Sequence, residues 1–256
     1  MIELRTPGEV DAMREAGRVV GRILAAVRQH AAVGTTLRDL DDLARGMLAE
    51  AGATSPFLGY DPFPDAPPFP GVLCLSVGDA VLHGIPTDRR LRDGDLLSVD
   101  CGATLDGWVG DAAVSFVVGP TPDPADLALV ATTEQALAAG IAAAVPGGRL
   151  GDVSAAIAAV GRAAGCGIDT TFGGHGVGRT MHESPSVPND GRAGRGLTLR
   201  PGLVVAIEPW FTAGGVDDHV VDPDGWTLRS VDGSSGAHAE HTVAVTADGP
   251  RVLTLP

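Results

Sequence analysis

The chain has 256 residues, 44% of them hydrophobic and 20% charged, which is enough material for a sizeable buried core. A net charge of -14 without a basic tract excludes a protein that wraps nucleic acid by neutralising phosphates. Three cysteines without framework spacing, no signal-peptide pattern and no apolar run of bilayer length together predict a soluble cytoplasmic protein.

Four helices are expected, arranged as two pairs. The first opens at Thr6-Pro7-Gly8-Glu9, which combines an N-cap, a proline at the first helical position and a capping-box glutamate. An amphipathic pattern continues from there to Val27. The other three helices are expected over residues 36–52, 123–146 and 150–165.

Strands are expected between the helix pairs and after the second pair, over residues 72–77, 96–103, 108–118, 203–211 and 239–246. Helices in pairs and strands in groups predict an α+β fold, with an antiparallel-rich sheet covered by helices on one face. The Pro- and Asp-rich stretch 58–71 is expected to be a long loop that is functional or mobile.

The chain also carries an internal repeat. Residues 34–40 resemble residues 147–153, and residues 91–100 align with residues 199–208, at offsets of roughly 110 residues. Chance similarity in an Ala- and Leu-rich chain is the alternative. However, both strand copies end on a carboxylate directly after an apolar run, which is costly unless the carboxylate is paired or binds a cation. We therefore expect one domain with halves of about 1–118 and 119–256, and chemistry at Asp100 and Glu208.

A hairpin signal places a second carboxylate near Asp100. Asp106-Gly107 is typical of a two-residue β-turn, which would set Asp111 opposite Gly102. Asp100 and Asp111 would then be diagonal neighbours on one face, about 7–8 Å apart at their bases and able to share metal ions. Two exposed strand aspartates remain the alternative for this hairpin alone.

Three further candidate ligands occur downstream. His175 stands among the glycines of residues 173–178, which allow close backbone approach, while Glu208 and Glu240 lie in predicted strands. A lone His or an edge Glu is more often structural. Four carboxylates and one imidazole at strand ends together indicate a metal site, and this oxygen-rich set suits Mn²⁺, Fe²⁺ or Co²⁺ at least as well as Zn²⁺.

The ordered set of five resembles the ligands of the methionine aminopeptidase and Xaa-Pro peptidase superfamily, whose architecture is the pita-bread fold. Within it, the chain is most similar to type I methionine aminopeptidases, and the resemblance covers nearly the whole sequence. Each matching block is a modest signal, but their order is very specific. The blocks are Ser55-Pro-Phe-Leu-Gly-Tyr60, His83-Gly-Ile-Pro86, Asp106-Gly-Trp-Val-Gly-Asp111, Gly174-His-Gly-Val-Gly-Arg179, His182-Glu-Ser-Pro185 and Glu240-His-Thr242.

The resemblance implies a single catalytic domain, 1–256, with pseudo-twofold duplicated units around a dinuclear site. It implies two divalent ions, Co, Mn, Fe or Zn, bridged by a water or hydroxide that attacks the first peptide bond. By this resemblance Asp100 binds one ion in a bidentate manner, Asp111 and Glu240 bridge, and His175 and Glu208 complete the shell of the other.

The same resemblance implies roles in catalysis for three residues. Glu208 would shuttle a proton from the attacking water to the leaving amine. His182 would contact the scissile carbonyl and its developing charge, and His83 the backbone just beyond the scissile bond. For either histidine taken alone, a structural role is the alternative.

A methionine pocket is implied by the matches Tyr60, Phe63, Cys74 and Trp226, because a flexible thioether needs a snug apolar cavity. The sequence departs from the family pattern at the pocket rim. Met181 stands where Phe is common, Phe57 where Cys is common, and Gly78-Asp79 where Asn-Glu is usual, while residues 66–71 look like extra loop. These departures affect pocket shape but leave the metal ligands unchanged.

The implied function is removal of the initiator methionine from nascent polypeptides whose second residue is small, by a cytoplasmic monomer without membrane or specific nucleic-acid partners. Xaa-Pro peptidases share the five ligands but usually carry a large N-terminal domain, and type II methionine aminopeptidases carry an insertion between the last two ligands. A non-catalytic pita-bread binding protein is the third alternative. A transient ribosome contact is also implied, with Arg192, Arg195 and Arg200 as candidates, although a solvated loop accounts for these arginines better.

Overall fold

The computed structural model describes residues 2–62 and 66–256. In that part of the chain the helices are α1 (Pro7–His30), α2 (Leu37–Glu50), α3 (Pro124–Ala143) and α4 (Leu150–Ala163). The strands are β1 (Leu73–Val77), β2 (Ala80–Leu82), β3 (Leu96–Leu105), β4 (Trp108–Val117), β5 (Gly174–Gly176), β6 (Glu183–Val187), β7 (Val204–Ile207), β8 (Trp210–Thr212), β9 (His219–Val221), β10 (Leu228–Ser230), β11 (Gly236–His238), β12 (Glu240–Thr246) and β13 (Gly249–Val252).

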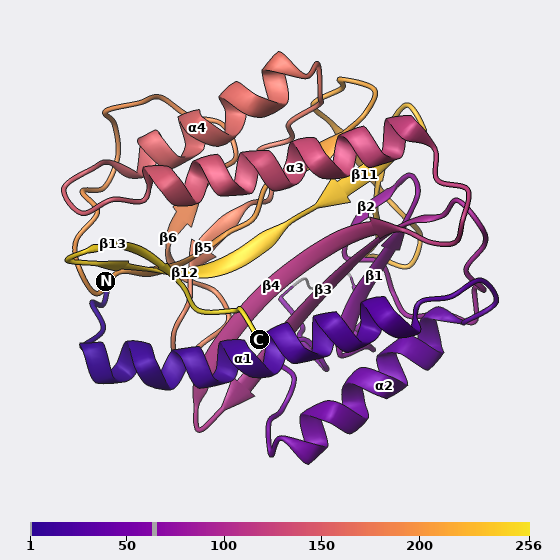
Figure 1. Cartoon of the computed structure of the whole chain (residues 1–256), viewed down its shortest axis with the longest axis horizontal. Coiled ribbons are helices and arrows are strands. Elements are labelled where there is room, and N and C mark those ends of the chain that lie inside the picture. The colour runs from indigo at the N-terminus through magenta and orange to yellow at the C-terminus, as the bar shows by residue number, and fades with distance from the viewer. Residues whose placement is uncertain (1, 63–65) are drawn as a thin grey trace.

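The main sheet has the strand order β1-β3-β4-β12-β7-β5-β6, with β13 paired to β12. Two small sheets, β2-β10-β9 and β11-β8, adjoin it. Every strand pair among the described residues is antiparallel. In Figure 1, α1 and α2 lie along the lower side of the strands and α3 and α4 along the upper side. The predicted α+β class and antiparallel sheet are thus confirmed.

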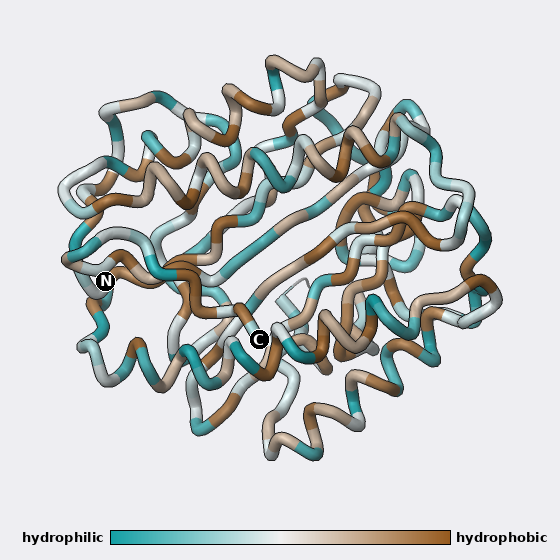
Figure 2. The backbone as a smooth tube through the Cα atoms, in the orientation of Figure 1, coloured by the Kyte–Doolittle hydropathy of each residue, from teal (hydrophilic) through white to brown (hydrophobic). Residues whose placement is uncertain are grey.

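Local signals fix where the first two helices begin. The Glu9 amide donates to the Thr6 hydroxyl at 3.3 Å, and the Thr6 amide donates to the Glu9 carboxylate at 2.8 Å. Thr36 and Asp39 form the same reciprocal capping box at the start of α2. Each box satisfies amides that the helix itself leaves unpaired. Figure 2 shows hydrophobic and hydrophilic segments alternating along α1, as an amphipathic helix requires.

The predicted repeat is visible in the backbone contacts. Thr36, just before α2, forms an isolated antiparallel bridge with Arg90, and Arg149, just before α4, forms one with Thr198. The two bridges join corresponding positions of the repeat, so each half ties its second helix to the segment that leads into a strand with a candidate ligand, Asp100 or Glu208. The fold is therefore a duplicated helix-pair and β unit.

Each half has its own hydrophobic core on the helix side of the sheet. In the first half, Val99 and Cys101 of β3 pack in one cluster with Ile23 of α1. In the second, Val205 and Ile207 of β7 pack in one cluster with residues of α3 and α4. Because side chains alternate along a strand, Asp100, between Val99 and Cys101, points to the opposite face. The helices therefore cover one face and leave the carboxylates on the other.

Two features differ from the sequence expectation. The strand expected over 203–211 is divided at Glu208-Pro209 into β7 and β8, which belong to different sheets. Pro209 has no amide hydrogen and so cannot continue the ladder, but its carbonyl still accepts the Ala239 amide at 3.0 Å. The short strands β2, β5, β6, β9, β10, β11 and β13 were not predicted, because three to five residues give too little periodicity.

No helix in the described ranges is both long and apolar enough to cross a membrane.

Candidate active site

The β3–β4 hairpin brings the first two candidate ligands together. Asp106 and Gly107 both have positive φ, 50° and 74°, as a tight two-residue hairpin turn requires. The register that follows pairs Asp111 with Gly102, as the turn signal predicts. Asp100 therefore lies on the same face as Asp111, two positions along the neighbouring strand.

The other candidate ligands continue this face across the sheet. Ala113 of β4 pairs with Asp100 on one side and with Glu240 of β12 on the other. Glu208 directly follows β7, the next strand in the sheet, and His175 lies in β5 beyond it. Five neighbouring strands thus contribute one residue each, in the order Asp100, Asp111, Glu240, Glu208 and His175.

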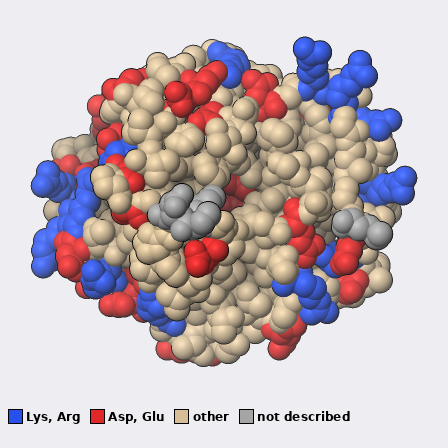
Figure 3. Space-filling view, turned by 180° about the vertical axis from the view of Figure 1, so that it is seen from behind, with Lys and Arg blue, Asp and Glu red and all other residues tan. Residues whose placement is uncertain are grey.

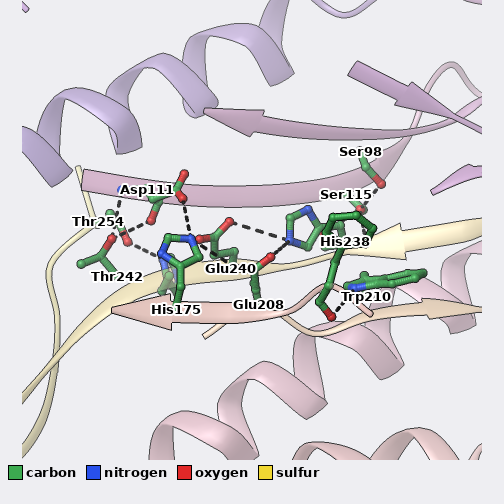
Figure 4. Close-up of polar contacts among 12 residues, drawn as sticks. Ser98, Asp111, Ser115, His175, Glu208, Trp210, His238, Glu240, Thr242 and Thr254 are labelled. Carbon is green, nitrogen blue, oxygen red and sulfur yellow. Dashed lines mark hydrogen bonds and ion pairs between the residues drawn. The ribbon is translucent and has the colours of Figure 1, made fainter. Parts of the chain in front are cut away.

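The side chains of these residues converge, as Figure 4 shows for the four that it labels. His175 Nε2 lies 3.6 Å from Asp111 Oδ2 and 3.5 Å from Glu208 Oε1. His175 Nδ1 lies 2.9 Å from the Gly176 carbonyl oxygen, which only an N–H can contact favourably. In the neutral ring the lone pair is therefore on Nε2, toward the carboxylates. One ligand atom each from Asp111, His175 and Glu240 lies within 4.8 Å of the others.

Unpaired buried oxygens indicate that this group is built for a cation. Oδ1 of Asp100, Oδ1 of Asp111 and Oε1 of Glu240 are buried and have no hydrogen-bond partner among the described residues. Such atoms cost free energy unless a donor or a cation satisfies them. Four carboxylates and an imidazole are also donors that divalent transition metals accept. The residues present therefore fit a bound metal.

Burial, together with neighbouring charges, shifts the pKa values of the group. Burial, followed by the charge of Asp111, raises the pKa of Asp100 and of Glu240 well above the usual carboxyl range. Burial also raises the pKa of Glu208 to about 7. For His175, burial lowers the pKa, but the carboxylates of Asp111 and Glu208 outweigh it and raise the pKa to about 9. A divalent cation opposes all these shifts, because it favours ionised carboxylates and a neutral imidazole.

One residue of the site, His238, was not predicted from the sequence. Its side chain is 2% exposed, and its Nε2 lies 3.7 Å from Glu240 Oε2 and 3.9 Å from Glu208 Oε2. Figure 4 shows the ring beside the two glutamates. Burial lowers the pKa of His238 to about 3, so the ring is neutral. The available signal was its position two residues before Glu240, on the same side of an extended segment.

His182 stands next to the carboxylate group. Its ring centroid is 4.4 Å from that of His175, and its Nδ1 is 2.9 Å from the Tyr60 hydroxyl. Desolvation, followed by the charge of His175, lowers the pKa of His182 to about 4. The pKa of His83 is likewise lowered to about 4, chiefly by burial, and its ring packs edge-on against Phe172 at 5.1 Å. Both histidines are therefore neutral near pH 7.

These residues line one cavity of about 320 Å³ together with the metal-site carboxylates. Of the predicted pocket residues, Tyr60, Cys74, Met181, His83, His182 and Trp226 line it, while Phe63 lies outside the described residues. Phe69 and Phe172 also line it, and sequence reasoning did not single them out. Figure 3 shows a hollow near the middle of the face turned away from the viewer in Figure 1, with acidic atoms at its base.

Aromatic packing shapes the apolar end of the cavity. Phe69 meets the Trp226 ring edge-on, with centroids 5.2 Å apart, and Tyr60 lies 6.4 Å from the same ring. The Phe69 amide donates to the Tyr60 carbonyl at 2.9 Å, which ties the two ends of the loop together. Phe57 and Met181, the departures from the family pattern, are both buried lining residues. The result is an apolar wall beside a cluster of carboxylates.

The fold and the site define a candidate metal centre: four carboxylates and one imidazole from five adjacent antiparallel strands face a cavity with an apolar wall. Residues 11–247 match metallopeptidase family M24. The chain belongs to this family of metal-dependent peptidases.

Individual relatives agree with this assignment along the whole chain. Methionine aminopeptidase 1 of Mycobacterium tuberculosis is 50% identical over 100% of this chain and 96% of its own length. Methionine aminopeptidase of Clostridium perfringens is 41% identical over 100% of this chain and 99% of its own.

Solved structures show the same fold. The structure of Thermotoga maritima methionine aminopeptidase has a TM-score of 0.94 at 38% identity and covers 100% of both chains. Prolidase from Pyrococcus furiosus shares the fold with a TM-score of 0.78 at 22% identity, over 99% of this chain and 65% of the prolidase chain. The pita-bread architecture expected from the sequence is therefore confirmed.

Proposed function

We propose that the protein is a methionine aminopeptidase that removes the initiator methionine from nascent polypeptides whose second residue is small. The observation that carries the proposal is the junction of two parts in one cavity. One part is the set of four carboxylates and one imidazole on five adjacent strands, and the other is the apolar wall around Trp226. Full-length relatives named methionine aminopeptidase support it.

The metal site of the proposal holds two divalent ions, with Co, Mn, Fe and Zn as candidates. Asp100, Asp111, His175, Glu208 and Glu240 would hold them, and the unpaired buried oxygens support this assignment. When bound, such ions lower the pKa of a coordinated water so that a nucleophile is available near neutral pH. Glu208, which directly follows β7 and lines the cavity, is the residue we assign to move a proton from the attacking water to the leaving amine.

His182 and His83 are assigned to the substrate backbone. If the Tyr60 hydroxyl donates to His182 Nδ1, the proton of the neutral ring is on Nε2, and Nε2 can donate to the scissile carbonyl. That contact strengthens as negative charge develops on the oxygen. His83, held against Phe172, would contact the backbone beyond the scissile bond.

The chemistry of the pocket lining supports methionine as the first residue of the substrate. Tyr60, Cys74, Met181 and Trp226 present mainly apolar surface, which a thioether fills without leaving a polar group unpaired. A charged first side chain would lose water without gaining a partner, at a cost of several kcal/mol. Phe63, which the family resemblance assigns to the same wall, lies outside the described residues.

We also propose that residues 1–256 form one catalytic domain and that the enzyme is a cytoplasmic monomer. The contact of each helix pair with a ligand-bearing half of one sheet supports a single domain. For a transient ribosome contact, Arg192, Arg195 and Arg200 remain the candidates, and all three are exposed.

A Xaa-Pro peptidase of the same fold is the second candidate function, and a peptide panel separates the two. With Co²⁺ or Mn²⁺ at one fixed concentration, we expect release of methionine from Met-Ala-Ser and Met-Gly-Met-Met. We expect poor cleavage of Met-Leu, Met-Lys and Met-Glu peptides of matched length, because a large second side chain would meet the pocket rim. Amino-acid release measured by chromatography gives kcat/KM for each peptide.

Chelation provides the control for metal dependence. Thorough removal of metal should abolish release, and Mn²⁺, Co²⁺ or Fe²⁺ should restore it. Full activity in verified metal-free protein would overturn the proposed chemistry. Absence of release from every peptide with each of these metals would instead favour the non-catalytic alternative. Faster cleavage of Ala-Pro-Ala than of Met-Ala-Ser would overturn the methionine assignment alone.

A further inference from the structure

His238 is a buried histidine with an unpaired nitrogen that points at the metal site. Its Nε2 has no hydrogen-bond partner in the described part of the chain, although the residue is only 2% exposed. A buried ring nitrogen without a partner costs free energy and calls for an explanation. The roles proposed for the five ligands do not explain this unpaired nitrogen.

The atoms around His238 Nε2 are metal ligands rather than hydrogen-bond partners. One ligand atom each from His238, Asp100 and Glu240 lies within 4.8 Å of the others. The distance from Nε2 to Glu240 Oε2, 3.7 Å, is too long for a hydrogen bond. Two ligands at about 2.1 Å from one ion are separated by about 3–4 Å, so this distance suits a shared cation.

The site therefore contains two groups of the same kind that share one residue. The first is Asp111, His175 and Glu240, and the second is Asp100, His238 and Glu240. Each has one aspartate from the β3–β4 hairpin and one imidazole from a neighbouring strand, with Glu240 between them. His238 is thus the imidazole of the group that contains Asp100, just as His175 is the imidazole of the group that contains Asp111.

The backbone holds His238 in this place. Its amide donates to Ser115 Oγ at 2.9 Å, and Ser115 Oγ donates to its carbonyl at 2.7 Å. Ser115 in turn lies 2.7 Å from Ser98 Oγ. Because both backbone groups of His238 are hydrogen-bonded within a buried strand, the direction of its imidazole ring is restricted. A preorganised metal ligand needs such a restriction.

We infer that His238 is a sixth metal ligand, which supplies nitrogen to the ion held by Asp100 and Glu240. The inference rests on the proposed function, because it presupposes the two-ion site. With His238 each of the two ions has one imidazole, instead of one ion having only oxygen ligands. A nitrogen ligand shifts the preference of the second position from Mn²⁺ toward Co²⁺, Ni²⁺ and Zn²⁺.

Cobalt titration of the metal-free full chain tests this without an activity assay. Visible absorption of Co²⁺ reports ligand type and number, and calorimetry reports the affinity of each step. The wild type should bind two equivalents. In His238→Gln one step should keep its spectrum and affinity, while the other should weaken by at least about tenfold and change its absorption.

His241→Gln is the matched control. His241 is the residue after Glu240, and its Nδ1 lies 2.8 Å from Thr254 Oγ1, away from the carboxylates. This variant should retain both cobalt steps unchanged. Circular dichroism and the thermal midpoint of the metal-free variants show whether each is folded.

A second measurement needs no variant. Proton NMR of the cobalt-loaded wild type, with histidine ring signals identified by selective deuteration, should show two metal-shifted imidazoles. A single shifted imidazole, or identical titrations of wild type and His238→Gln, would overturn the role of His238. The proposed function would survive either of these results, provided that the wild type binds two ions and releases methionine. Failure of the wild type to bind two ions would overturn both the role of His238 and the proposed two-ion site.

Discussion

At the scale of single residues, His182 offers the sharpest division between binding and catalysis. It lies beside His175 but is not among the carboxylates and imidazoles that group as ligands. Its neutral ring can donate one hydrogen bond, and Tyr60 is placed to decide which nitrogen does so. An interaction that strengthens only in the transition state raises kcat rather than substrate affinity.

Replacing His182 with alanine should therefore lower kcat while metal binding persists. The expected loss is on the order of 10²–10³-fold, as for removal of one electrostatic donor to a developing oxyanion. Steady-state kinetics on Met-Ala-Ser, with metal content measured by mass spectrometry, check the prediction. Tyr60→Phe should cause a smaller loss of kcat. The imidazole of His182 remains in this variant, but its tautomer is no longer fixed by the Tyr60 hydroxyl. Unchanged kcat in His182→Ala would return His182 to a structural role.

The sequence reveals some site residues better than others, for physical reasons. Asp100 and Glu208 stand out because each directly follows an apolar run, where an ionised side chain is costly. Asp111 follows from the hairpin turn, whose geometry fixes the register. Phe69 and Phe172 give no such signal, because they enter the cavity from loops whose course depends on tertiary contacts. His238 was overlooked because the strand that carries it has only three residues.

At the scale of elements, one buried carboxylate joins α2 to the start of β1. Asp41 Oδ1 accepts the amides of Val72 at 2.7 Å and of Leu73 at 2.9 Å, and its other oxygen accepts Arg45 Nε at 2.7 Å. Arg45 also donates to the Pro70 carbonyl at 2.9 Å. This network holds the strand that carries Cys74 into the pocket, opposite Asp100.

Asp41→Ala should lower the free energy of unfolding by about 3 kcal/mol, because it leaves two buried amides and a guanidinium without their acceptor. Urea denaturation at a fixed metal concentration measures the change, since bound metal contributes to stability. Asp42→Ala, at the next and exposed position, is the control and should cost less than about 0.5 kcal/mol. Equal effects of the two substitutions would contradict the role of Asp41.

Helices were easier to predict than strands for a reason visible in these contacts. Their capping boxes are complete within four residues, so Thr6 with Glu9 and Thr36 with Asp39 are readable from the sequence. Strand boundaries depend on partners far away in the chain. The division at Pro209 illustrates this, since β7 pairs with β12 and β8 with β11.

At the scale of the whole molecule, the two halves meet along the β4–β12 pairing, and the site spans this junction. Folding therefore brings like charges together, and the metal-free protein must accommodate them. It does so through protons: the pKa of Glu208 is raised to about 7 and that of His175 to about 9. Three other histidines are shifted the opposite way, to about 3 or 4: His83, His182 and His238.

The direction of each pKa shift decides in which pH range the group changes the free energy of unfolding. The native state holds protons on Glu208 and His175 that the unfolded chain has lost, so their stabilisation decreases as pH rises toward their native pKa values. His83, His182 and His238 bind fewer protons in the native state, so they favour folding as pH rises, but only up to about 6.5. Above that pH these three are neutral in both states. Asp100 and Glu240, whose pKa values are also raised well above the usual carboxyl range, act in the same direction. Between pH 6.5 and 8.5 the protons held by His175 and by these buried carboxyl groups therefore decide how stability changes with pH.

Metal-free protein should accordingly lose at least about 2 kcal/mol of unfolding free energy between pH 6.5 and 8.5, the amount that His175 alone would contribute. Metal-loaded protein should show no such loss, because a cation replaces the proton on His175 and binds more tightly as pH rises. Urea denaturation across this range, with and without saturating Co²⁺, makes the comparison. His175→Asn in the metal-free state is the control and should reduce the slope, because one of the groups with a raised pKa is gone. A flat profile in the metal-free wild type, or an undiminished slope in His175→Asn, would contradict this account of how the empty site is stabilised.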